Sequence, residues 1–235
     1  MKKKCVVLGA TGLIGQQFVR LLADHPNFDL TNIYASKRSA GKDLSDIWQL
    51  PNYNIPSTFN NLKIEDLNEI SNNPNFYIAF SGLPTGIAKD VETNLRDKGV
   101  AVFSNASAHR MDSEVPILIP EINLEQLELA KVQQEKFDTT GFIITNANCS
   151  VTGAAIYLYE LSNILDINTS VITTYQAKSG AGYKGLSNQA IINNVFPFIQ
   201  SEEDKIAIEA NKIMGYYQNN SIKPREHSII ANCAR

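Results

Sequence analysis

Short apolar runs alternate with stretches of helical periodicity in the first half of the chain. The apolar runs have the length of buried strands and cover residues 4–8, 30–35, 76–80 and 100–103. Between the first two runs, Phe18, Leu21 and Leu22 recur at helical spacing until His25-Pro26 ends the helix. Residues 89–98 carry a second amphipathic helical pattern. Strand, glycine-bearing turn and helix in this order predict the opening of a parallel α/β unit.

The hydrophobic pattern changes near Pro120. Asn123 is placed to cap a helix that begins at Leu124, with Gln126 three residues on as its capping-box partner. Further strands are expected over 142–145, 170–177 and 228–234, and further helices over 147–165, 189–199 and 202–214. Residues 44–75 are rich in Asn and Pro and offer only a weak helical pattern near 64–70.

The composition is that of a globular protein, because 43% of the residues are hydrophobic and 19% are charged. With 21 Lys and Arg against 24 Asp and Glu, the formal net charge is −3, and without a long basic run no nucleic-acid partner is expected. No apolar stretch approaches the roughly 18 residues that a transmembrane helix requires. The basic start at Lys2–Lys4 precedes an apolar run too short for a signal peptide, which predicts a cytoplasmic protein without membrane contact.

A glycine-rich turn follows the first predicted strand at once. Gly9 permits a tight turn, Gly12 lets backbone N–H groups approach a pyrophosphate, and Gly15 lets the helix pack closely on the sheet. The glycines are spaced G-x-x-G-x-x-G, a departure from the common G-x-G-x-x-G, and glycine turns also serve purely structural purposes. The place of this turn between a strand and an amphipathic helix favours dinucleotide binding by a Rossmann-like domain.

The end of the second predicted strand discriminates between the nicotinamide cofactors. An NAD site usually has Asp or Glu about 20 residues past the glycines to bind the ribose 2′-hydroxyl. Ser36, Lys37, Arg38 and Ser39 occupy that place here, and all four are hydrogen-bond donors. They suit a 2′-phosphate and predict NADP(H); the alternative is a solvated basic turn.

Cys149 is the sharpest candidate for chemistry, because it lies between an apolar strand and the first turn of an apolar helix. A helix N-terminus favours the thiolate, which is the reactive species, and free N–H groups of that turn can stabilise an oxyanion. Asn148 can orient the carbonyl or fix the loop. Cys5 and Cys233 are expected to be small buried residues. The three cysteines are widely spaced and fit neither a disulfide framework nor a zinc site, so no metal is expected.

Several segments of the chain resemble the aspartate-semialdehyde dehydrogenase family, particularly its archaeal and fungal branch. They run in the family's order and are 9–15, 35–42, 104–106 with Arg110, 115–121, 146–150, Gln176 with 179–182, and 202–205. The resemblance implies an α/β fold with a Rossmann-like NADP-binding domain over residues 1–122. An α+β catalytic and dimerisation domain would follow over residues 123–235, incomplete at its C-terminus.

The resemblance also implies a reaction. Cys149 looks like the nucleophile that attacks L-aspartyl 4-phosphate and forms a thioester, and Gln176 is similar to the residue that positions the substrate beside it. Phosphate would leave, and hydride from NADPH would convert the thioester to L-aspartate 4-semialdehyde. This aldehyde is a precursor of lysine, threonine and methionine.

Substrate and cofactor contacts follow from the same resemblance. Arg110 and Lys205 match the family's phosphate-binding pair, and Glu202 matches the contact to the substrate amino group. Arg235 resembles the arginine that binds the α-carboxylate, so the cations and the single glutamate complement the charges of the substrate. The residues that match cofactor contacts are Gly9, Thr11, Gly12, Leu13, Ile14, Ser36, Arg38, Ser39, Ser179 and Gly180.

One family feature is missing from this sequence. The family has a general acid/base histidine a few residues beyond the arginine that Arg235 resembles, and its chains continue well past it to form homodimers or homotetramers. His227 precedes Arg235 on the same predicted strand, about 26 Å away at about 3.3 Å per residue. His25 follows the first helix, and His109 is expected to be a solvated loop residue. The sequence also ends within a predicted strand, so we expect a fragment with impaired activity.

Three hypotheses stay open. The chain belongs to an NADP-dependent aspartate-semialdehyde dehydrogenase, or to a related reductase with the same thioester chemistry, such as malonyl-CoA reductase or N-acetyl-glutamyl-phosphate reductase. Alternatively, it is a catalytically inactive NADP-binding module. Glu202 and Arg235 favour an amino-acid substrate over a CoA thioester, and the abrupt end disfavours a short protein that is complete.

Overall fold

The computed structural model describes residues 1–70, 74–186 and 188–235, and its backbone forms two compact units. The first unit contains residues 1–109 and 133–144, and the second contains residues 110–132 and 145–235. The chain therefore passes between the units more than once. The predicted boundary after residue 122 lies within the first segment of the second unit.

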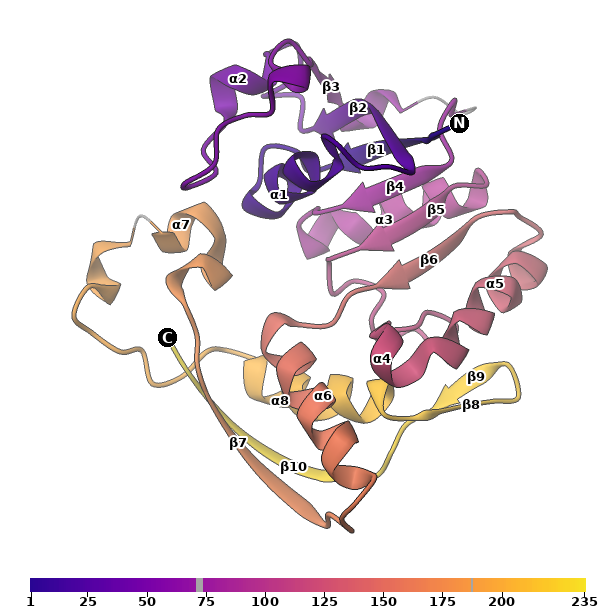
Figure 1. Ribbon diagram of the computed structural model, residues 1–235, viewed down its shortest axis with the longest axis vertical. Helices are drawn as coiled ribbons and strands as arrows, with labels where there is room; N and C mark the ends of the chain where they lie inside the picture. Colours follow the sequence, from indigo (N-terminus) through magenta and orange to yellow (C-terminus); the bar gives the residue numbers. More distant parts are fainter. Residues whose placement is uncertain (71–73, 187) are drawn as a thin grey trace. The chain divides into compact units, whose positions relative to one another are not determined.

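A six-stranded sheet with the order β3-β2-β1-β4-β5-β6 organises the first part of the chain (Figure 1). Its strands are β1 (Lys3–Leu8), β2 (Phe28–Ala35), β3 (Ile64–Asp66), β4 (Ile78–Ser81), β5 (Ala101–Ser104) and β6 (Phe142–Thr145). β1 pairs in parallel with both β2 and β4, and the order turns back at β1 as in doubly wound nucleotide-binding folds. The helices between these strands are α1 (Leu13–Leu22), α2 (Leu44–Ile47), α3 (Thr85–Asp97), α4 (Pro120–Asn123) and α5 (Leu129–Phe137). The predicted Rossmann-like sheet is confirmed.

Close approach of backbone at the carboxyl end of β1 explains the glycine turn. Gly9 has φ +78°, which favours glycine, and a β-carbon on it would lie 2.7 Å from the carbonyl oxygen of Gly82. A β-carbon on Gly15 would overlap the carbonyl oxygen of Gly9. The N–H of Gly9 donates to the carbonyl of Tyr34 on β2 (2.9 Å). The turn is therefore locked against the sheet, and α1 begins at Leu13 directly above it.

The second unit packs two helices against a pair of parallel strands, β7 (Thr169–Tyr175) and β10 (Ser228–Ala234). The helices are α6 (Cys149–Ser162) and α8 (Glu202–Ile213), and α7 (Gly182–Leu186) and the antiparallel hairpin β8 (Tyr216–Gln218) and β9 (Ser221–Lys223) complete the unit. Its core gathers apolar residues of both helices and of β10, among them Val151, Ala155, Ile206, Ala210 and Cys233. Exposure alternates along β7 because one face of this small sheet covers the core.

The helix expected near residues 64–70 does not form. Ile64 is buried and pairs with Ile33 as part of β3, and a single 3₁₀ turn, Leu67–Glu69, follows it. Asp66 accepts the N–H of Asn68 at the start of that turn (3.0 Å). The sheet edge offered Ile64 burial that an isolated short helix does not provide, so tertiary packing overrode the weak local pattern.

The helix expected over 189–199 is also wrong, since only the 3₁₀ turn Gln189–Ile191 is present there. Several of its apolar residues, among them Ile192, Val195 and Phe198, are exposed, so a helix there would bury little apolar surface. Instead, the N–H and carbonyl of Phe196 exchange hydrogen bonds with the carbonyl and N–H of Arg235 (2.7 and 2.9 Å). This extended pairing fixes the segment beside the end of β10.

The capping box expected at Asn123 and Gln126 is wrong as well. The amide of Asn123 accepts from the N–H of Ile119 and donates to Gln126 (2.8 and 3.0 Å), and both side chains are buried. Gln126 donates to the carbonyls of Lys212, Ile213 and Gly215 at the end of α8. The two residues tie the 117–126 segment to α8, and the regular helix begins only at Leu129.

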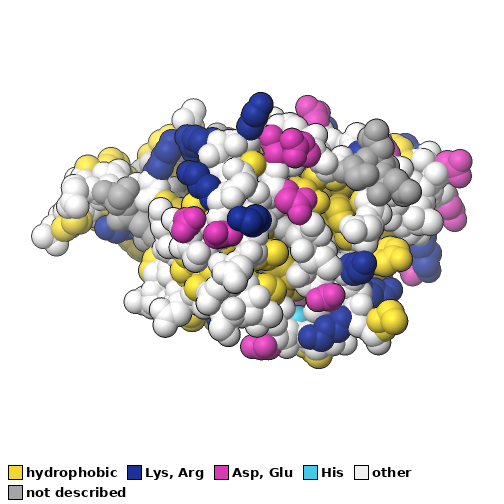
Figure 2. Space-filling view, turned by 90° about the horizontal axis from the view of Figure 1, so that it is seen from above, with side chains coloured by type: hydrophobic (Ala, Val, Ile, Leu, Met, Phe, Trp, Pro, Cys, Tyr) yellow, Lys and Arg dark blue, Asp and Glu magenta, His cyan; other side chains and the backbone are white. Residues whose placement is uncertain are grey.

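No helix among the described residues is both long and apolar enough to span a membrane. On the face drawn in Figure 2, Lys and Arg side chains lie among Asp and Glu side chains.

Gly15→Ala tests the close approach at the glycine turn. We expect a loss of about 1–3 kcal/mol in unfolding free energy, because the new methyl group meets backbone that has no room to move. Gly86→Ala is the matched control, since nothing lies within 4 Å of a β-carbon there and alanine favours the helix. Urea unfolding followed by circular dichroism measures both variants. Equal stability of the two would contradict this account of the turn.

Candidate functional site

The turn between β6 and α6 presents Cys149 at the start of a 14-residue helix. Asn148 is the N-cap, and its side-chain oxygen accepts the N–H of Ser150 (2.9 Å). Cys149 is exposed, whereas Cys5 and Cys233 are 0% and 1% exposed. The two cysteines expected to be buried are therefore buried. An exposed thiol at the positive end of a helix is suited to act as a nucleophile.

Two backbone N–H groups of this turn already have acceptors. The N–H of Asn148 donates to Oε2 of Glu209 (2.8 Å), and that of Ser150 is held by the cap. Among the described residues, the N–H of Cys149 has no acceptor. Only part of the turn is thus available to stabilise an oxyanion, and the N–H of the cysteine itself is one available donor.

Glu202, the first residue of α8, connects three other candidate residues. Its carboxylate accepts from the amide of Asn148 (2.8 Å) and from the ammonium of Lys205 (3.2 Å). Burial alone would raise the pKa of Glu202, but hydrogen bonds from Asn148, Lys205 and Gln176 outweigh it and hold the pKa below its ordinary value. The carboxylate is therefore ionised at neutral pH.

Gln176 and Arg235 follow the two paired strands β7 and β10. The N–H of Gln176 donates to the carbonyl of Ala234 (2.8 Å), and Nη2 of Arg235 donates to Oε1 of Gln176 (2.9 Å). Nε of Arg235 is buried and has no partner among the described residues. A buried donor without an acceptor is costly, so this guanidinium edge is poised for an anionic oxygen.

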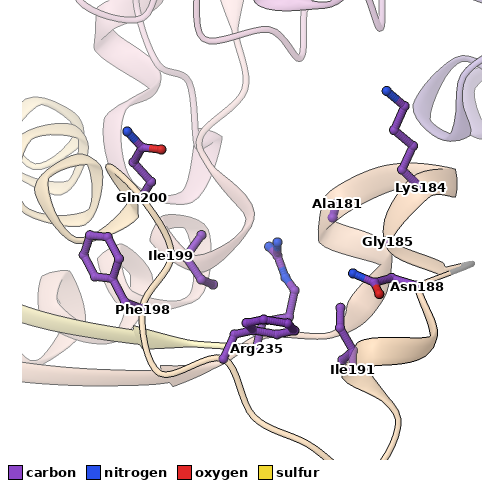
Figure 3. Close-up of a pocket in the computed structure, with 10 residues that line it drawn as sticks. Ala181, Lys184, Gly185, Asn188, Ile191, Phe198, Ile199, Gln200 and Arg235 are labelled. Atoms are coloured by element: carbon purple, nitrogen blue, oxygen red, sulfur yellow. The ribbon is translucent and has the colours of Figure 1, made fainter.

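Arg235 also lines a pocket of about 360 Å³ within the second unit. Figure 3 shows its side chain rising from the end of β10 between Ile199 and Ala181. Gly180 belongs to the neighbouring 3₁₀ turn, Lys178–Ala181, together with the exposed Ser179. A β-carbon on Gly180 would lie 2.8 Å from Nη2 of Arg235, so glycine leaves room for the guanidinium.

Glu209 connects Arg110 to the turn that carries Cys149, and Lys212 fixes the loop around Arg110. Its guanidinium donates to Oε1 of Glu209 (2.9 Å), and both side chains are buried. Lys212 is buried too and donates to the carbonyls of Arg110, Asp112 and Val115 (2.5, 2.7 and 2.8 Å). Burial lowers the pKa of Lys212 to about 8.

The sequence does carry a signal for Glu209 and Lys212. Glu202, Lys205, Glu209 and Lys212 recur at helical spacing and lie on one face of α8. The last two fall among Ile206, Ala210 and Ile213, which are fully buried. A charged residue on the buried face of a helix is rarely without a partner. The spacing of Glu209 and Lys212 therefore indicates that they belong to a polar network.

The residues proposed to contact the cofactor lie in the first unit, apart from Ser179 and Gly180. Leu13 and Ile14 open α1 behind Gly12, the N-cap, which has no side chain to block the helix N-terminus. Ser36, Lys37 and Arg38 are exposed at the carboxyl end of β2, and Ser39 closes the turn through an N–H bond to Ser36 (2.8 Å). The glycine cradle and the exposed cationic turn fit a dinucleotide with a 2′-phosphate.

The expectation that His109 is solvated is wrong. His109 is 2% exposed, with Nε2 lying 3.3 Å from the carbonyl oxygen of Lys89 and 3.9 Å from Glu92. Glu92 accepts from the hydroxyls of Ser81 and Ser104 (2.6 and 2.8 Å), and burial raises its pKa. The histidine therefore completes a buried polar cluster that joins α3 to the ends of β4 and β5.

His227 lies beside Ser170, with 2.9 Å between Nε2 and the hydroxyl, just before β10 begins. Arg235 follows the other end of that strand, so the two residues are about 26 Å apart at about 3.3 Å per residue. Among the described residues, no three His, Cys, Asp or Glu side chains gather as they would around a metal ion.

Two family models match the chain. The model for the NAD-binding domain of semialdehyde dehydrogenases matches residues 4–130, and the model for their dimerisation domain matches residues 158–235. The first match covers the glycine turn, and the second covers Gln176, α8 and Arg235.

Individual relatives agree with these models. An aspartate-semialdehyde dehydrogenase of Methanothermobacter thermautotrophicus is 39% identical over 235 residues, covering 97% of this chain and 66% of the relative. The crystal structure of the Candida albicans aspartate-semialdehyde dehydrogenase with NADP is 34% identical, with a TM-score of 0.88, and covers 100% of this chain and 68% of that one. A malonyl-CoA reductase (NADP) of Metallosphaera sedula is 35% identical, covering 96% of this chain and 63% of the relative. The chain thus spans about two thirds of the length of these proteins.

Selective alkylation tests the exposure of Cys149. Iodoacetamide is expected to modify Cys149 at least about tenfold faster than the other two cysteines, because they are buried and burial raises the pKa of Cys5 to about 12. Mass spectrometry of time points in native buffer measures the three rates. Cys149→Ser is the control and should leave only slow modification. Comparable rates in the folded chain would refute the assigned geometry.

Glu202→Gln tests the ionised carboxylate. Since the folded pKa lies below the ordinary 4.5, the charge contributes stability that is fully present above pH 4.5 and is lost as pH falls through the folded value. Solvent screens this partly exposed group, so we expect the variant to be about 0.5–1 kcal/mol less stable at neutral pH and to converge with wild type in acid. Urea titrations across pH measure this, with the exposed Asp204→Asn as control. A difference that persists in acid would point to packing rather than charge.

Proposed function

The chain belongs to the aspartate-semialdehyde dehydrogenase family, and from that premise we propose that it takes part in reducing L-aspartyl 4-phosphate to L-aspartate 4-semialdehyde and phosphate with NADPH. The observation that carries the proposal is the network around the exposed thiol. Asn148 links the Cys149 turn to Glu202, which in turn contacts Lys205 and Gln176. One unit therefore holds a nucleophile beside the charged groups that this substrate requires.

Covalent catalysis begins at Cys149. The thiolate attacks the acyl carbon, and the carbonyl oxygen gains negative charge as phosphate departs. The N–H of Cys149 is a donor of this turn that can meet that charge, whereas the neighbouring amides of Asn148 and Ser150 are engaged. The product of this step is a thioester on Cys149.

Substrate recognition is divided among charged residues. Arg235 offers Nε and the remaining guanidinium N–H groups to the α-carboxylate, with Gln176 fixing its orientation. The ionised Glu202 accepts the substrate ammonium group, while Lys205 and Arg110 bind the phosphate. Two anionic groups and one cationic group on the substrate are thereby matched by three cations and one carboxylate.

When bound, NADPH would supply the hydride that reduces the thioester and releases the thiol of Cys149. The residues that would hold it are Gly9, Thr11, Gly12, Leu13, Ile14, Ser36, Arg38 and Ser39, and the family resemblance adds Ser179 and Gly180. Gly12 has no side chain to block the N-terminus of α1, where the pyrophosphate would bind, and Arg38 with its neighbouring donors would bind the 2′-phosphate. This donor set favours NADPH over NADH.

The general acid/base is a histidine that lies beyond residue 235 in the family. His227 is at the far end of β10 from Arg235, and its imidazole contacts Ser170. We therefore propose that efficient turnover needs sequence beyond this chain, in a homodimer or homotetramer. The dimerisation family model, which matches residues 158–235, supports that assembly. The assembled enzyme would serve lysine, threonine and methionine synthesis in the cytoplasm.

A malonyl-CoA reductase function is the second candidate, favoured by the relative from Metallosphaera sedula. Malonyl-CoA has no ammonium group for Glu202 to accept. An N-acetylated substrate, as in N-acetyl-glutamyl-phosphate reduction, lacks that positive charge too. The ionised state of Glu202 therefore supports the aspartyl substrate.

NADPH oxidation decides among these functions. We expect turnover with L-aspartyl 4-phosphate and none with malonyl-CoA, measured by NADPH absorbance for this chain and for a version extended past Arg235. The extended version should be about 10²–10⁴-fold faster because it includes the acid/base group. Cys149→Ser should abolish the reaction.

Each contrary outcome has a distinct meaning. Turnover with malonyl-CoA alone would overturn the substrate assignment. Equal rates for the short and extended versions would refute the need for the distal histidine. Absence of turnover in both, with NADPH still bound, would favour an inactive cofactor-binding module.

A further inference from the structure

Glu209 joins two parts of the second unit that are far apart in sequence. One carboxylate oxygen accepts from Nη1 of Arg110 (2.9 Å), and the other accepts from the backbone N–H of Asn148 (2.8 Å). Arg110 lies in the loop that enters the second unit, and Asn148 directly precedes Cys149. A single side chain thus spans the distance between a phosphate-binding cation and the nucleophile's turn.

The chemistry of a carboxylate is essential to this bridge. Glu209 is 3% exposed, so each contact replaces water that the side chain lost on folding. Both partners are donors, and an ionised carboxylate is acceptor-only at its two oxygens. An amide of the same shape offers one acceptor and one donor, so it satisfies one partner and opposes the other.

The loop around Arg110 is anchored a second time by the same helix. Lys212, three residues after Glu209, donates to the carbonyls of Arg110, Asp112 and Val115. The loop backbone is therefore fixed by Lys212, and the Arg110 side chain is fixed by Glu209. Since Glu209 and Lys212 share a face of α8, the helix sets the direction of the guanidinium.

We propose that Glu209 is a positioning residue that holds Arg110 and the Asn148 turn in one fixed relation. Phosphate bound by Arg110 then lies at a set place relative to the thiol of Cys149. The inference rests on the proposed function for the roles of Arg110 and Cys149. It assigns to α8 a task beyond the substrate contacts of Glu202 and Lys205.

An effect of charge and an effect of geometry predict opposite changes in phosphate affinity when the Glu209 carboxylate is lost. As a nearby negative charge, Glu209 opposes anion binding, so its neutralisation alone would tighten phosphate binding. As a positioning residue, it aims Arg110, so its loss would weaken phosphate binding. The sign of the change therefore separates the two roles.

The experiment measures how inorganic phosphate protects Cys149 from iodoacetamide in this chain. Wild type is compared with Glu209→Gln, which keeps the shape but not both acceptors, and with Glu203→Gln as matched control. Glu203 lies on the same helix and also accepts a backbone N–H, that of Cys233 (3.1 Å), away from the Cys149 turn. Circular dichroism checks the fold of each variant.

We expect Glu209→Gln to need about 10- to 100-fold more phosphate for half-protection, since a misdirected Arg110 loses a charge-assisted hydrogen bond to phosphate, and such a loss has effects of that size. The rate without phosphate should stay within about twofold of wild type, because Cys149 remains exposed. Glu203→Gln should match wild type. If Glu209→Gln does not fold, Glu209→Asp replaces it, because the shorter side chain keeps the charge but cannot reach both partners.

Half-protection at an equal or lower phosphate concentration in the folded variant would overturn the positioning role while leaving the proposed function intact. Absence of protection in wild type would remove the phosphate subsite and overturn both.

Discussion

The site depends on the N-terminal turn of α6, where the backbone of Asn148 and Ser150 is committed before any substrate arrives. The Asn148 side chain caps the helix and reaches Glu202, while its N–H meets Glu209. Because α8 supplies both carboxylates, the thiol is fixed by a neighbouring helix rather than by its own loop. Glu209 is buried, so the loss of its contact with this turn would leave a buried carboxylate oxygen without that donor, which is costly.

The same helix carries two of the residues proposed to bind the substrate. Glu202 and Lys205 meet the turn from the first half of α8, and Glu209 and Lys212 hold the Arg110 loop from its second half. Gln176 and Arg235 reach the group from the ends of two paired strands. The dimerisation family model covers α8 and both strands, so the residues proposed to bind the substrate from these elements belong to that domain.

Much of the first unit could be predicted from the sequence, because its signals are local. The short apolar runs became β1, β2, β4 and β5, and the glycines at 9 and 15 fell where the backbone leaves no room for a β-carbon. Cys149 was found by its place between a strand and a helix. The roles of the candidate residues remain proposals, although several of them meet in one network.

What the sequence did not predict depended on contacts between distant segments. Residues 189–199 carry a helical pattern, but most of their apolar side chains are exposed, and Phe196 pairs with Arg235 instead. His109 was expected in solvent but lies beside Glu92. Glu92 is on α3, 17 residues earlier in the chain, so the local sequence around His109 does not indicate this contact. Glu209 was overlooked since its partners are 99 and 61 residues away.

The pair β7 and β10 has a consequence for how this chain behaves in solution. Each strand pairs along one side, and among the described residues its other side has no neighbouring strand. Val171, Tyr175 and Ile230 add exposed apolar surface to the same sheet. Open edges with such side chains are templates for strand addition from another molecule. The oligomeric state of the isolated chain should therefore vary with protein concentration. Dilute samples are the ones that report the properties of the single chain.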